Sequence, residues 1–448
     1  MNEELRSRLI RLRRDDERRE EPRSDGALGV AAVDEELPDW FTTRLARGGQ
    51  EGVGDARDGL APGLPAGIEA TQGERGAFAF RRTLFEAGHE HGDWKLADVR
   101  SAAGAELGWL ARDPELAALD PATAVYLDIE TTGLSGGAGT IPFLVALGRF
   151  DGERFELWQA FLRGPEEEAA ALAEVAHRIQ RASGVVSFFG KSFDRHRLED
   201  KMRMHRVAPP FAGKPHLDLY HPLARLYRGS FANARLTTLE HELCGVVREH
   251  DLPGSLAPAA WFDFLAGRAH RLEAVFRHNA LDVLSLPVLA AHLSCARREQ
   301  RADGQALAGC GRARARALAE QHAKQREHAA ALEWTERALT RWGSDEGELW
   351  FLHAELLRRL GEHERALEGF LTLARAREIP LAARAWLAAG KLALRLRRTD
   401  VLDEALERGP IAAQRASVGR ALARCQAEFE RLRMRRSALA DALSRATC

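Results

Sequence analysis

The sequence predicts an α/β domain, in which helices cover a sheet, followed by an all-α domain of helical repeats. Between about 124 and 296, apolar runs of strand length alternate with segments of helical spacing. Beyond about 300 the composition shifts to Ala, Leu, Arg and Glu, with helical spacing and no strand signal. The segment at 327–332 recurs at 362–367, an offset of 35 residues that is typical of stacked helix pairs.

Length and charge limit the possible classes of protein. A chain of 448 residues exceeds one average domain, so we expect two or three folded units. The 65 basic and 66 acidic side chains leave a formal charge of −1, which excludes a globally basic nucleic-acid binder. Any attraction to a polyanion must therefore come from local patches.

Cysteine usage and hydropathy indicate a cytoplasmic protein without membrane contact. The five cysteines are far apart and form no CxxC pair, which argues against a zinc site or a disulfide framework. The first residues contain no apolar segment of signal-peptide length, and no uncharged apolar run approaches the ~18 residues of a membrane span.

The N-terminal part divides at about residue 76. Residues 1–76 mix dense opposite charges with Gly-rich and Pro-containing stretches, so we expect a largely disordered charged tail. Within it, the run at 37–45 has the apolar character of a short docking element or of a loosely held turn. Residues 77–123 are expected to form an extension that packs on the α/β domain at 124–296.

Four apolar runs are expected to form strands, at 124–130, 143–150, 155–162 and 184–190. Turn residues at 135–139 and at Asp151-Gly152 connect the first three, and connections this short favour antiparallel neighbours. Helical patterns at 166–182, 236–245 and 270–293 supply the covering layer.

Acidic side chains mark the ends of two of these strands. Asp128 and Glu130 stand two apart on the first strand, so their side chains leave the same face. Asp194 follows the run at 184–190, where it is either a further ligand at the same sheet edge or the N-terminal cap of a helix. Asp218, on a short strand-like run, is expected to cap the helix that follows it.

His278 and Asp282 are four residues apart in a helical pattern, which places them on one helix face. Such a pair is often a surface hydrogen bond, but the apolar residues around it indicate a buried helix. Acids that meet in a fold need cations, and two divalent ions bound by oxygen are suited to phosphoryl transfer. An imidazole is suited to accept the proton of the attacking water.

A strand of nucleic acid would need further contacts beside these acids. Basic residues around the helix at the second motif are candidates for phosphate binding, with a solvated helix face as the alternative. The candidates for nucleic-acid contact are Thr131, Thr132, Lys191, Arg195, Arg197 and Lys201. The sequence has no evident ladder of stacking aromatics, so base-specific recognition is not expected. His89 and His91 are more typical of a packed turn than of a metal site.

The motifs DIETTGL, FFGKSFD and HNALD together resemble the DEDD-type exonuclease branch of the ribonuclease-H-like superfamily. The chain looks closest to the bacterial YprB-like group, which is similar in the glycine-rich turn with FLVALG and in the HLDLYHPLARLY segment. The resemblance covers roughly 80–295. It implies a mixed sheet flanked by helices, and helical repeats are commonly attached.

The resemblance also implies a site and an activity. Asp128, Glu130, Asp194 and Asp282 would bind two Mg²⁺ or Mn²⁺ ions, with His278 as the base of a 3′–5′ exonuclease acting on single-stranded DNA or RNA. Two departures are visible. The relatives usually carry asparagine at the position of Phe189, and the histidine subclass places its histidine five residues before the last aspartate, not four.

The region 300–448 resembles tetratricopeptide repeats in the segment at 349–370, with Leu360-Gly361 at the helix turn. Such repeats form surfaces for protein partners, and a final long helix is expected from Ile411. Two alternatives therefore stay open: a structure-selective endonuclease on the same fold, and a scaffold with a decayed site that binds a partner through its repeats.

Overall fold

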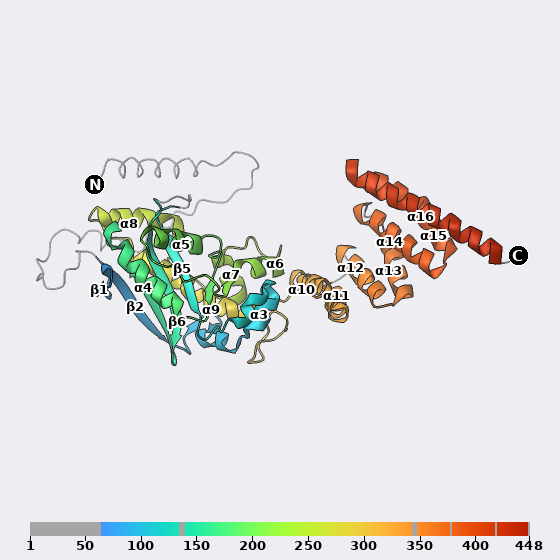
Figure 1. Cartoon of the computed structure of the whole chain (residues 1–448). Coiled ribbons are helices and arrows are strands. Elements are labelled where there is room, and N and C mark those ends of the chain that lie inside the picture. The colour runs from blue at the N-terminus through green and yellow to red at the C-terminus, as the bar shows by residue number, and fades with distance from the viewer. Residues whose placement is uncertain (1–63, 134–138, 343–346, 377–378, 417–418, 447–448) are drawn as a thin grey trace, which may run out of the picture. The chain divides into compact units, whose positions relative to one another are not determined.

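The computed structural model describes residues 64–133, 139–342, 347–376, 379–416 and 419–446 (Figure 1). These residues belong to one compact unit, Leu60–Cys448. At its centre is a seven-stranded sheet in the order β1-β2-β7-β6-β5-β8-β9. A separate two-stranded sheet consists of β3 (Glu90–His91) and β4 (Trp94–Lys95).

The large sheet is mixed. Its strands are β1 (Ile68–Gly73), β2 (Gly76–Glu86), β5 (Val125–Thr131), β6 (Pro142–Asp151), β7 (Arg154–Phe161), β8 (Val185–Ser187) and β9 (His216–Asp218). The neighbours from β1 to β5 are antiparallel, whereas β8 and β9 run parallel to β5. The predicted antiparallel order of the first three strands is confirmed. The strand expected at 184–190 is shorter and ends at Ser187.

Strands β1 and β2 correct the predicted N-terminal boundary. β1 lies inside the segment that we expected to be a charged tail, and it pairs with β2 along its whole length. β2 in turn pairs with β7, so it is an integral strand of the sheet and not an added extension. The prediction is wrong here because local composition hides a strand whose pairing partner supplies the stabilisation. The run at 37–45 lies outside the described residues.

Helices cover both faces of the sheet. They include η1 (Leu96–Ser101), α3 (Gly104–Ala111), η2 (Pro114–Ala118), η3 (Pro165–Glu167), α4 (Glu168–Gln180), α5 (Asp194–Met204), α6 (Tyr220–Leu226), α7 (Leu236–Cys244), η4 (Gly254–Leu256), α8 (Ala257–Leu265) and α9 (Leu272–Ser294). The helices predicted at 166–182, 236–245 and 270–293 are thereby confirmed, with small differences at their ends.

The alternation of side chains along β5 separates two cores. Leu127 and Ile129 pack with residues of α4 in one core, whereas Tyr126 lies in the other core with Val283 of α9. α9 approaches the sheet closely at Gly148, which pairs with Tyr126. A Cβ atom there would lie 2.7 Å from a methyl carbon of Val283, so glycine is required for this approach. The face that bears Tyr126 also bears Asp128 and Glu130.

From Arg312 onward, the described residues form helices joined by short connections. These helices are α10 (Arg312–Lys324), α11 (His328–Trp342), α12 (Gly347–Arg359), α13 (His363–Arg375), α14 (Ile379–Leu396), α15 (Thr399–Ala416) and α16 (Gly419–Ala446). Successive helices pack on one another, and Gly361 takes φ +88° at the turn between α12 and α13. The final helix begins at Gly419, not near Ile411, which lies within α15.

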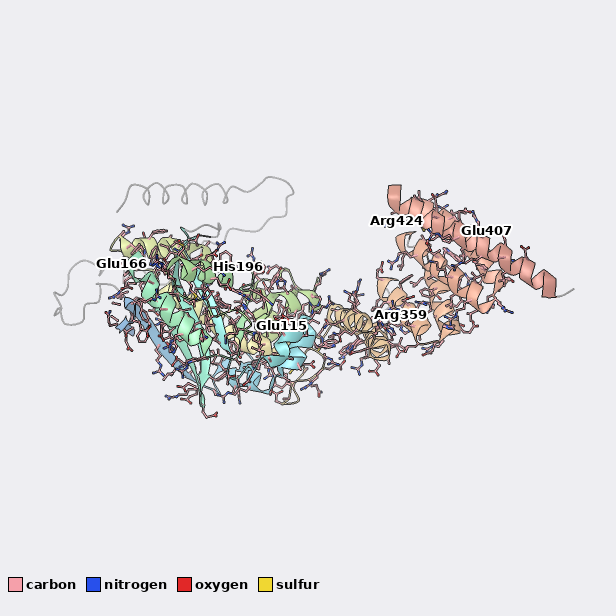
Figure 2. The ribbon with its side chains drawn as sticks, viewed as in Figure 1. Glu115, Glu166, His196, Arg359, Glu407 and Arg424 are labelled. Carbon is pink, nitrogen blue, oxygen red and sulfur yellow. The ribbon has the colours of Figure 1, made fainter. Side chains whose placement is uncertain are left out.

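The predicted boundary near 300 does not divide the hydrophobic core. Ala315 and Leu318 of α10 and Trp334 of α11 belong to the same buried cluster as Val283 of α9. Trp386 of α14 is also buried, in a separate cluster. Figure 2 labels exposed polar side chains, among them His196 of α5, Arg359 of α12 and Glu407 of α15. Within the described part of the chain, no helix combines the length and the apolar character that crossing a membrane requires.

Candidate active site

The predicted acidic residues come from three segments that the sheet brings together. Asp128 and Glu130 lie on β5, Asp194 is the first residue of α5, and Asp282 lies on α9. β5 and β8 are parallel neighbours, so β5 and the segment leading from β8 into α5 end at the same edge. The register between β5 and β6 shifts between Glu130 and Thr131, a bulge of the kind that redirects side chains beside functional sites.

Burial and mutual repulsion act on these acids together. The pKa of Asp128 and that of Glu130 are both raised well above their usual values, first by burial and then by the charges of Asp282 and Asp194. The pKa of Asp194 is raised to about 8 by burial and by the charges of Asp218 and Asp282. The charge of Asp282 thus acts on all three of these carboxyl groups, and their raised pKa values favour the uptake of protons or of a cation.

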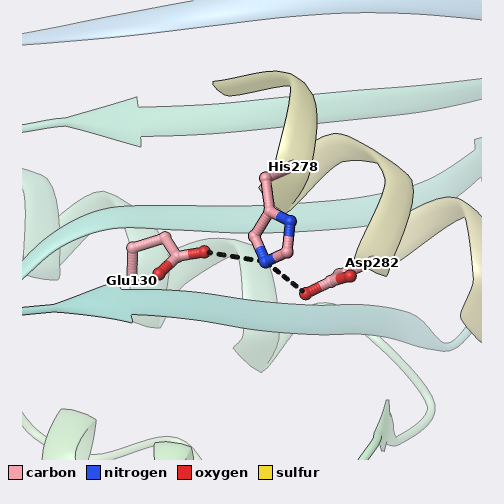
Figure 3. A group of neighbouring side chains, drawn as sticks. All are labelled: Glu130, His278 and Asp282. Atoms are coloured by element: carbon pink, nitrogen blue, oxygen red, sulfur yellow. Dashed lines mark ion pairs between the residues drawn. The ribbon is translucent and has the colours of Figure 1, made fainter. Parts of the chain in front are cut away.

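Glu130, His278 and Asp282 form the tightest group (Figure 3). The imidazole Nε2 lies 4.0 Å from Glu130 Oε1 and 3.6 Å from Asp282 Oδ2. One atom from each of the three side chains lies within 4.8 Å of the others, a spacing that suits coordination of one cation. Oxygen-rich donors of this type match a hard divalent ion.

Asp251 fixes the orientation of the His278 ring. His278 Nδ1 lies 2.8 Å from Asp251 Oδ1, so Asp251 accepts the Nδ1 hydrogen and leaves Nε2 directed at Glu130 and Asp282. Burial tends to raise the pKa of Asp251, but its hydrogen bonds with His278 and Arg248 outweigh burial and lower it. Asp251 was missed from the sequence because it lies in the irregular segment after α7, where no periodicity marks it.

Arg248 supplies the positive charge at the site. Its guanidinium contacts Asp251 at 3.0 Å, Asp282 at 2.6 Å and Glu240, and the side chain is only 6% exposed. Burial tends to lower the pKa of Arg248, but its hydrogen bonds and the surrounding acids raise the pKa by more than burial lowers it, so the guanidinium stays charged. Arg248 thus neutralises Glu240 and holds one oxygen of Asp282. No sequence pattern singles it out.

A buried amide chain positions Asp128. Asn279 Nδ2 donates to Asp128 Oδ2 at 2.6 Å, and Gln159 Nε2 donates to Asn279 Oδ1 at 2.9 Å. Both amide residues are fully buried. Asn279 follows His278 directly, so the HNALD motif contained the signal for it. Gln159 lies on β7, which also carries Arg154 and Glu156, so no pattern in the sequence singled it out.

Asp194 is placed by a tight loop, not by capping. Asp194 is the first residue of α5 and Phe193 occupies the N-cap position, which argues against the N-cap alternative. A Cβ atom at Gly190 would lie 2.6 Å from Ser187 Oγ and 2.7 Å from Asp194 Oδ2, so a side chain there would displace one or both of these groups. Asp218 accepts the N–H groups of Phe189 at 2.7 Å and Lys191 at 3.1 Å, and, as expected, that of Tyr220 at the start of α6.

The residues predicted to contact nucleic acid differ in whether their polar groups are already engaged by other parts of the chain. Thr131 Oγ1 donates to the carbonyl of Gly133, and Thr132 Oγ1 accepts the N–H of Ile141, so both hydroxyls hold the end of β5. Lys191 Nζ lies 3.1 Å from Asp113, with its side chain 42% exposed. It remains a candidate for a phosphate contact.

Along α5, the basic face is largely paired. The prediction that Lys201 contacts nucleic acid is corrected. Its side chain is buried, and Nζ lies 3.0 Å from a carboxylate oxygen of Glu168. Lys201 therefore stabilises the contact between α4 and α5 and does not face a substrate. Arg195 pairs with Glu199 at 2.8 Å, and Arg197 packs over the ring of Phe193. The helix therefore presents less free positive charge than its sequence indicates.

His91 is a packed residue, as expected. It is buried and shares a hydrogen bond of 2.9 Å with Ser285 of α9. Burial and the charge of Arg248 lower its pKa to about 4, so the ring is neutral at physiological pH. It stabilises the contact of β3 with α9.

Comparison with known proteins agrees with this fold. A family model of the RNase_H superfamily matches residues 125–294, from the first residue of β5 to the last of α9. The fold of these residues is ribonuclease-H-like. The chain is also 35% identical over 171 residues to "Uncharacterized protein YprB" of Bacillus subtilis (strain 168). That match covers 38% of this chain and 41% of the relative, so less than half of either protein takes part.

Proposed function

We propose that this protein is a metal-dependent 3′–5′ exonuclease that hydrolyses single-stranded nucleic acid. The main support is the convergence of Asp128, Glu130, Asp194 and Asp282 on one sheet edge, where burial and mutual repulsion raise the pKa of the first three. The RNase_H-superfamily match supports a nuclease-like hydrolase. The polarity of cleavage and the single-strand preference rest on the resemblance of the motifs to the DEDD-type branch.

The residues present fit two divalent cations, Mg²⁺ or Mn²⁺. Asp128, Glu130, Asp194 and Asp282 offer carboxylate oxygens, and Glu130 and Asp282 already lie within binding distance of one centre. Such ions stabilise the negative charge that develops on the attacking and leaving oxygens during phosphodiester hydrolysis. Neutralising the four carboxylates also removes the repulsion between them.

The chain's own residues would orient the reaction. His278 Nε2 faces the acidic group and is suited to accept a proton from the attacking water, while Asp251 holds the ring through Nδ1. Arg248 fixes Asp282, and Asn279 fixes Asp128, so two of the ligands are held in place before substrate arrives. Preorganised ligands of this kind reduce the reorganisation that the transition state requires.

The Asp128→Asn variant tests the proposal. It retains the shape of the side chain and the contact with Asn279 but removes a negative charge, so Mn²⁺-dependent release of nucleotides from an end-labelled single strand should fall by about 10³-fold or more. The assay uses 3′- and 5′-labelled DNA and RNA strands, duplexes and hybrids, with Mg²⁺ or Mn²⁺. Stepwise shortening from the 3′ end is expected.

The exposed Asp303→Asn, outside the acidic group, is the matched control and should cleave as the wild type does. Internal cuts in branched or hybrid substrates would favour the endonuclease alternative. Wild-type protein that is inert on every strand with either metal would refute the nuclease proposal.

A further inference from the structure

Phe189 is unusual in its conformation and its exposure. It takes φ +59°, a left-handed conformation that a bulky side chain rarely adopts, and it is 48% exposed. Phe189 is the only aromatic residue among the exposed large hydrophobic side chains of the described residues. A single exposed apolar residue needs no explanation by itself. An exposed aromatic residue that is also strained and lies beside the acidic group does need an explanation.

The backbone of Phe189 is held rigidly. Its N–H donates to Asp218 Oδ1, while the second oxygen of the same carboxylate accepts the N–H of Lys191. Between them lies Gly190, where a Cβ atom would come within 2.6 Å of Ser187 Oγ and 2.7 Å of Asp194 Oδ2, so the loop passes close to both side chains. The loop is therefore clamped on both sides of the ring, and the strain at Phe189 persists because the surrounding contacts determine it.

The ring rests on other aromatic side chains. Tyr220 contacts it edge-on, with ring centroids 5.0 Å apart and an interplanar angle of 79°. His221 lies 6.3 Å away, and its side chain is 55% exposed. Phe188 packs against the same tyrosine at 5.7 Å. These contacts support the ring from the protein side and leave nearly half of the residue exposed to solvent.

The ring is also close to the acidic group. Phe189 lies in the loop that joins β8 to α5, and a Cβ atom at the next residue, Gly190, would lie 2.7 Å from Asp194 Oδ2, so this part of the loop passes beside the carboxylate. A phosphodiester bound at the carboxylates would therefore bring an adjoining base near this ring. Every base offers a π face, so stacking here requires no particular sequence.

We propose that Phe189, supported by Tyr220 and His221, is a stacking platform for one unpaired nucleobase of a strand bound at the carboxylates. This inference rests on the proposed nuclease function and adds a base-binding subsite to it. Paired bases are already stacked on their neighbours, so the platform favours a single-stranded end over a duplex. It also accounts for an aromatic ring that a soluble protein would otherwise bury.

Binding of a fluorescein-labelled single strand in Ca²⁺, measured by anisotropy with the full-length protein, tests the platform. The main variant is Phe189→Asn, because asparagine tolerates the left-handed conformation and leaves the loop unstrained. The dissociation constant should rise roughly tenfold, which is about 1.4 kcal/mol and lies within the range that one stacked base contributes. Phe189→Trp should bind within about twofold of the wild type, whereas Phe189→Leu should resemble Phe189→Asn.

Two further measurements separate stacking from general apolar contact. A strand with 2-aminopurine at its 3′ end should be quenched by the wild type and not by Phe189→Asn, and an abasic end should bind both proteins equally. Leu84→Ala, a second exposed apolar residue on β2, is the control and should leave binding unchanged.

Equal affinities of wild type and Phe189→Asn, or a Phe189→Leu variant that binds as tightly as Phe189→Trp, would overturn the platform. If the wild type still degrades strands, that result leaves the nuclease proposal intact. A wild-type protein that neither binds nor cleaves any strand overturns both. Retained cleavage by Asp128→Asn together with Phe189-dependent binding overturns the proposed catalytic site alone.

Discussion

The Asp194 carboxyl links the site to the stability of the fold. Its pKa is about 8 in the folded protein against an ordinary value of 3.8, so folding binds a proton in the pH range between these values. The folded state then holds more protons than the unfolded chain, and the free energy of unfolding falls as pH rises through that range. Buried His91, His216 and His292 have lowered pKa values, and their effect lies below pH ~6.5.

The pH dependence of thermal stability follows from this sign. For metal-free wild type, Tm should fall between pH 7 and 8.5, and Asp194→Asn should show a smaller fall because its amide does not titrate. Mn²⁺ should raise the Tm of the wild type more at pH 8.5 than at pH 7, since cation binding replaces protons on the ligands. Differential scanning fluorimetry in EDTA and in Mn²⁺ measures both effects. Parallel pH profiles of the two proteins would contradict the assignment.

At the scale of elements, the site depends on how α9 meets the segment between α7 and α8. α9 supplies His278, Asn279 and Asp282, and the segment at 245–253 supplies Arg248 and Asp251. Glu240 in the middle of α7 is fully buried, and burial raises its pKa against the opposing effect of Arg248. Arg248 is therefore a structural ion that joins two helices as well as a support for Asp282.

Removing Arg248 should destabilise the protein strongly. Arg248→Met leaves Glu240 buried without its charge partner, for which a loss of about 3–5 kcal/mol in the free energy of unfolding is typical. The double variant Glu240→Gln/Arg248→Met should recover part of the loss, because the amide carries no charge to bury. Urea unfolding followed by circular dichroism measures the difference.

Arg203→Met is the matched control, because Arg203 also pairs with a glutamate, Glu199, but its side chain is 58% exposed. It should change the free energy of unfolding by less than about 1 kcal/mol. A loss for Arg248→Met no larger than that of the control would show that Arg248 is not a buried structural ion.

At the scale of the whole molecule, the first of the C-terminal helices completes the core of the α/β domain. Gln321 of α10 accepts from Arg112 at 3.2 Å and donates to the carbonyl of Trp109. The His322 ring lies 4.5 Å from the ring of Trp109, between centroids. These contacts explain why composition alone misplaces the boundary: the shift to helical sequence occurs before the shared core ends.

Truncation tests this boundary. A protein of residues 64–296 should have a lower Tm and bind more of a hydrophobic dye than one of residues 64–342, because it exposes the apolar surface that α10 and α11 cover. Thermal melting and dye fluorescence provide the comparison. Equal stability of the two proteins would place the domain end before α10.

The fold class and the acidic pairs were predictable because their signals are local. The period of two along β5 placed Asp128 and Glu130 on one face, and the spacing of four placed His278 and Asp282 together on α9. The residue whose predicted role was corrected, Lys201, has its decisive neighbours in distant parts of the chain. The sequence places Lys201 on a basic helix face, but in the fold its side chain is buried and forms an ion pair with Glu168 of α4.

The sequence by itself determined the alternation of strands and helices, the change to an all-helical region, and the identity of the acids that meet. These depend on periodicities of a few residues along the chain. Only the tertiary structure decided that Arg248 and Asp251 support the site, that Phe189 stands strained and exposed beside it, and that β1 and α10 belong to the same compact unit. The physical reason is that burial, pKa shifts and ion pairing depend on neighbours far away in sequence, which no local pattern records.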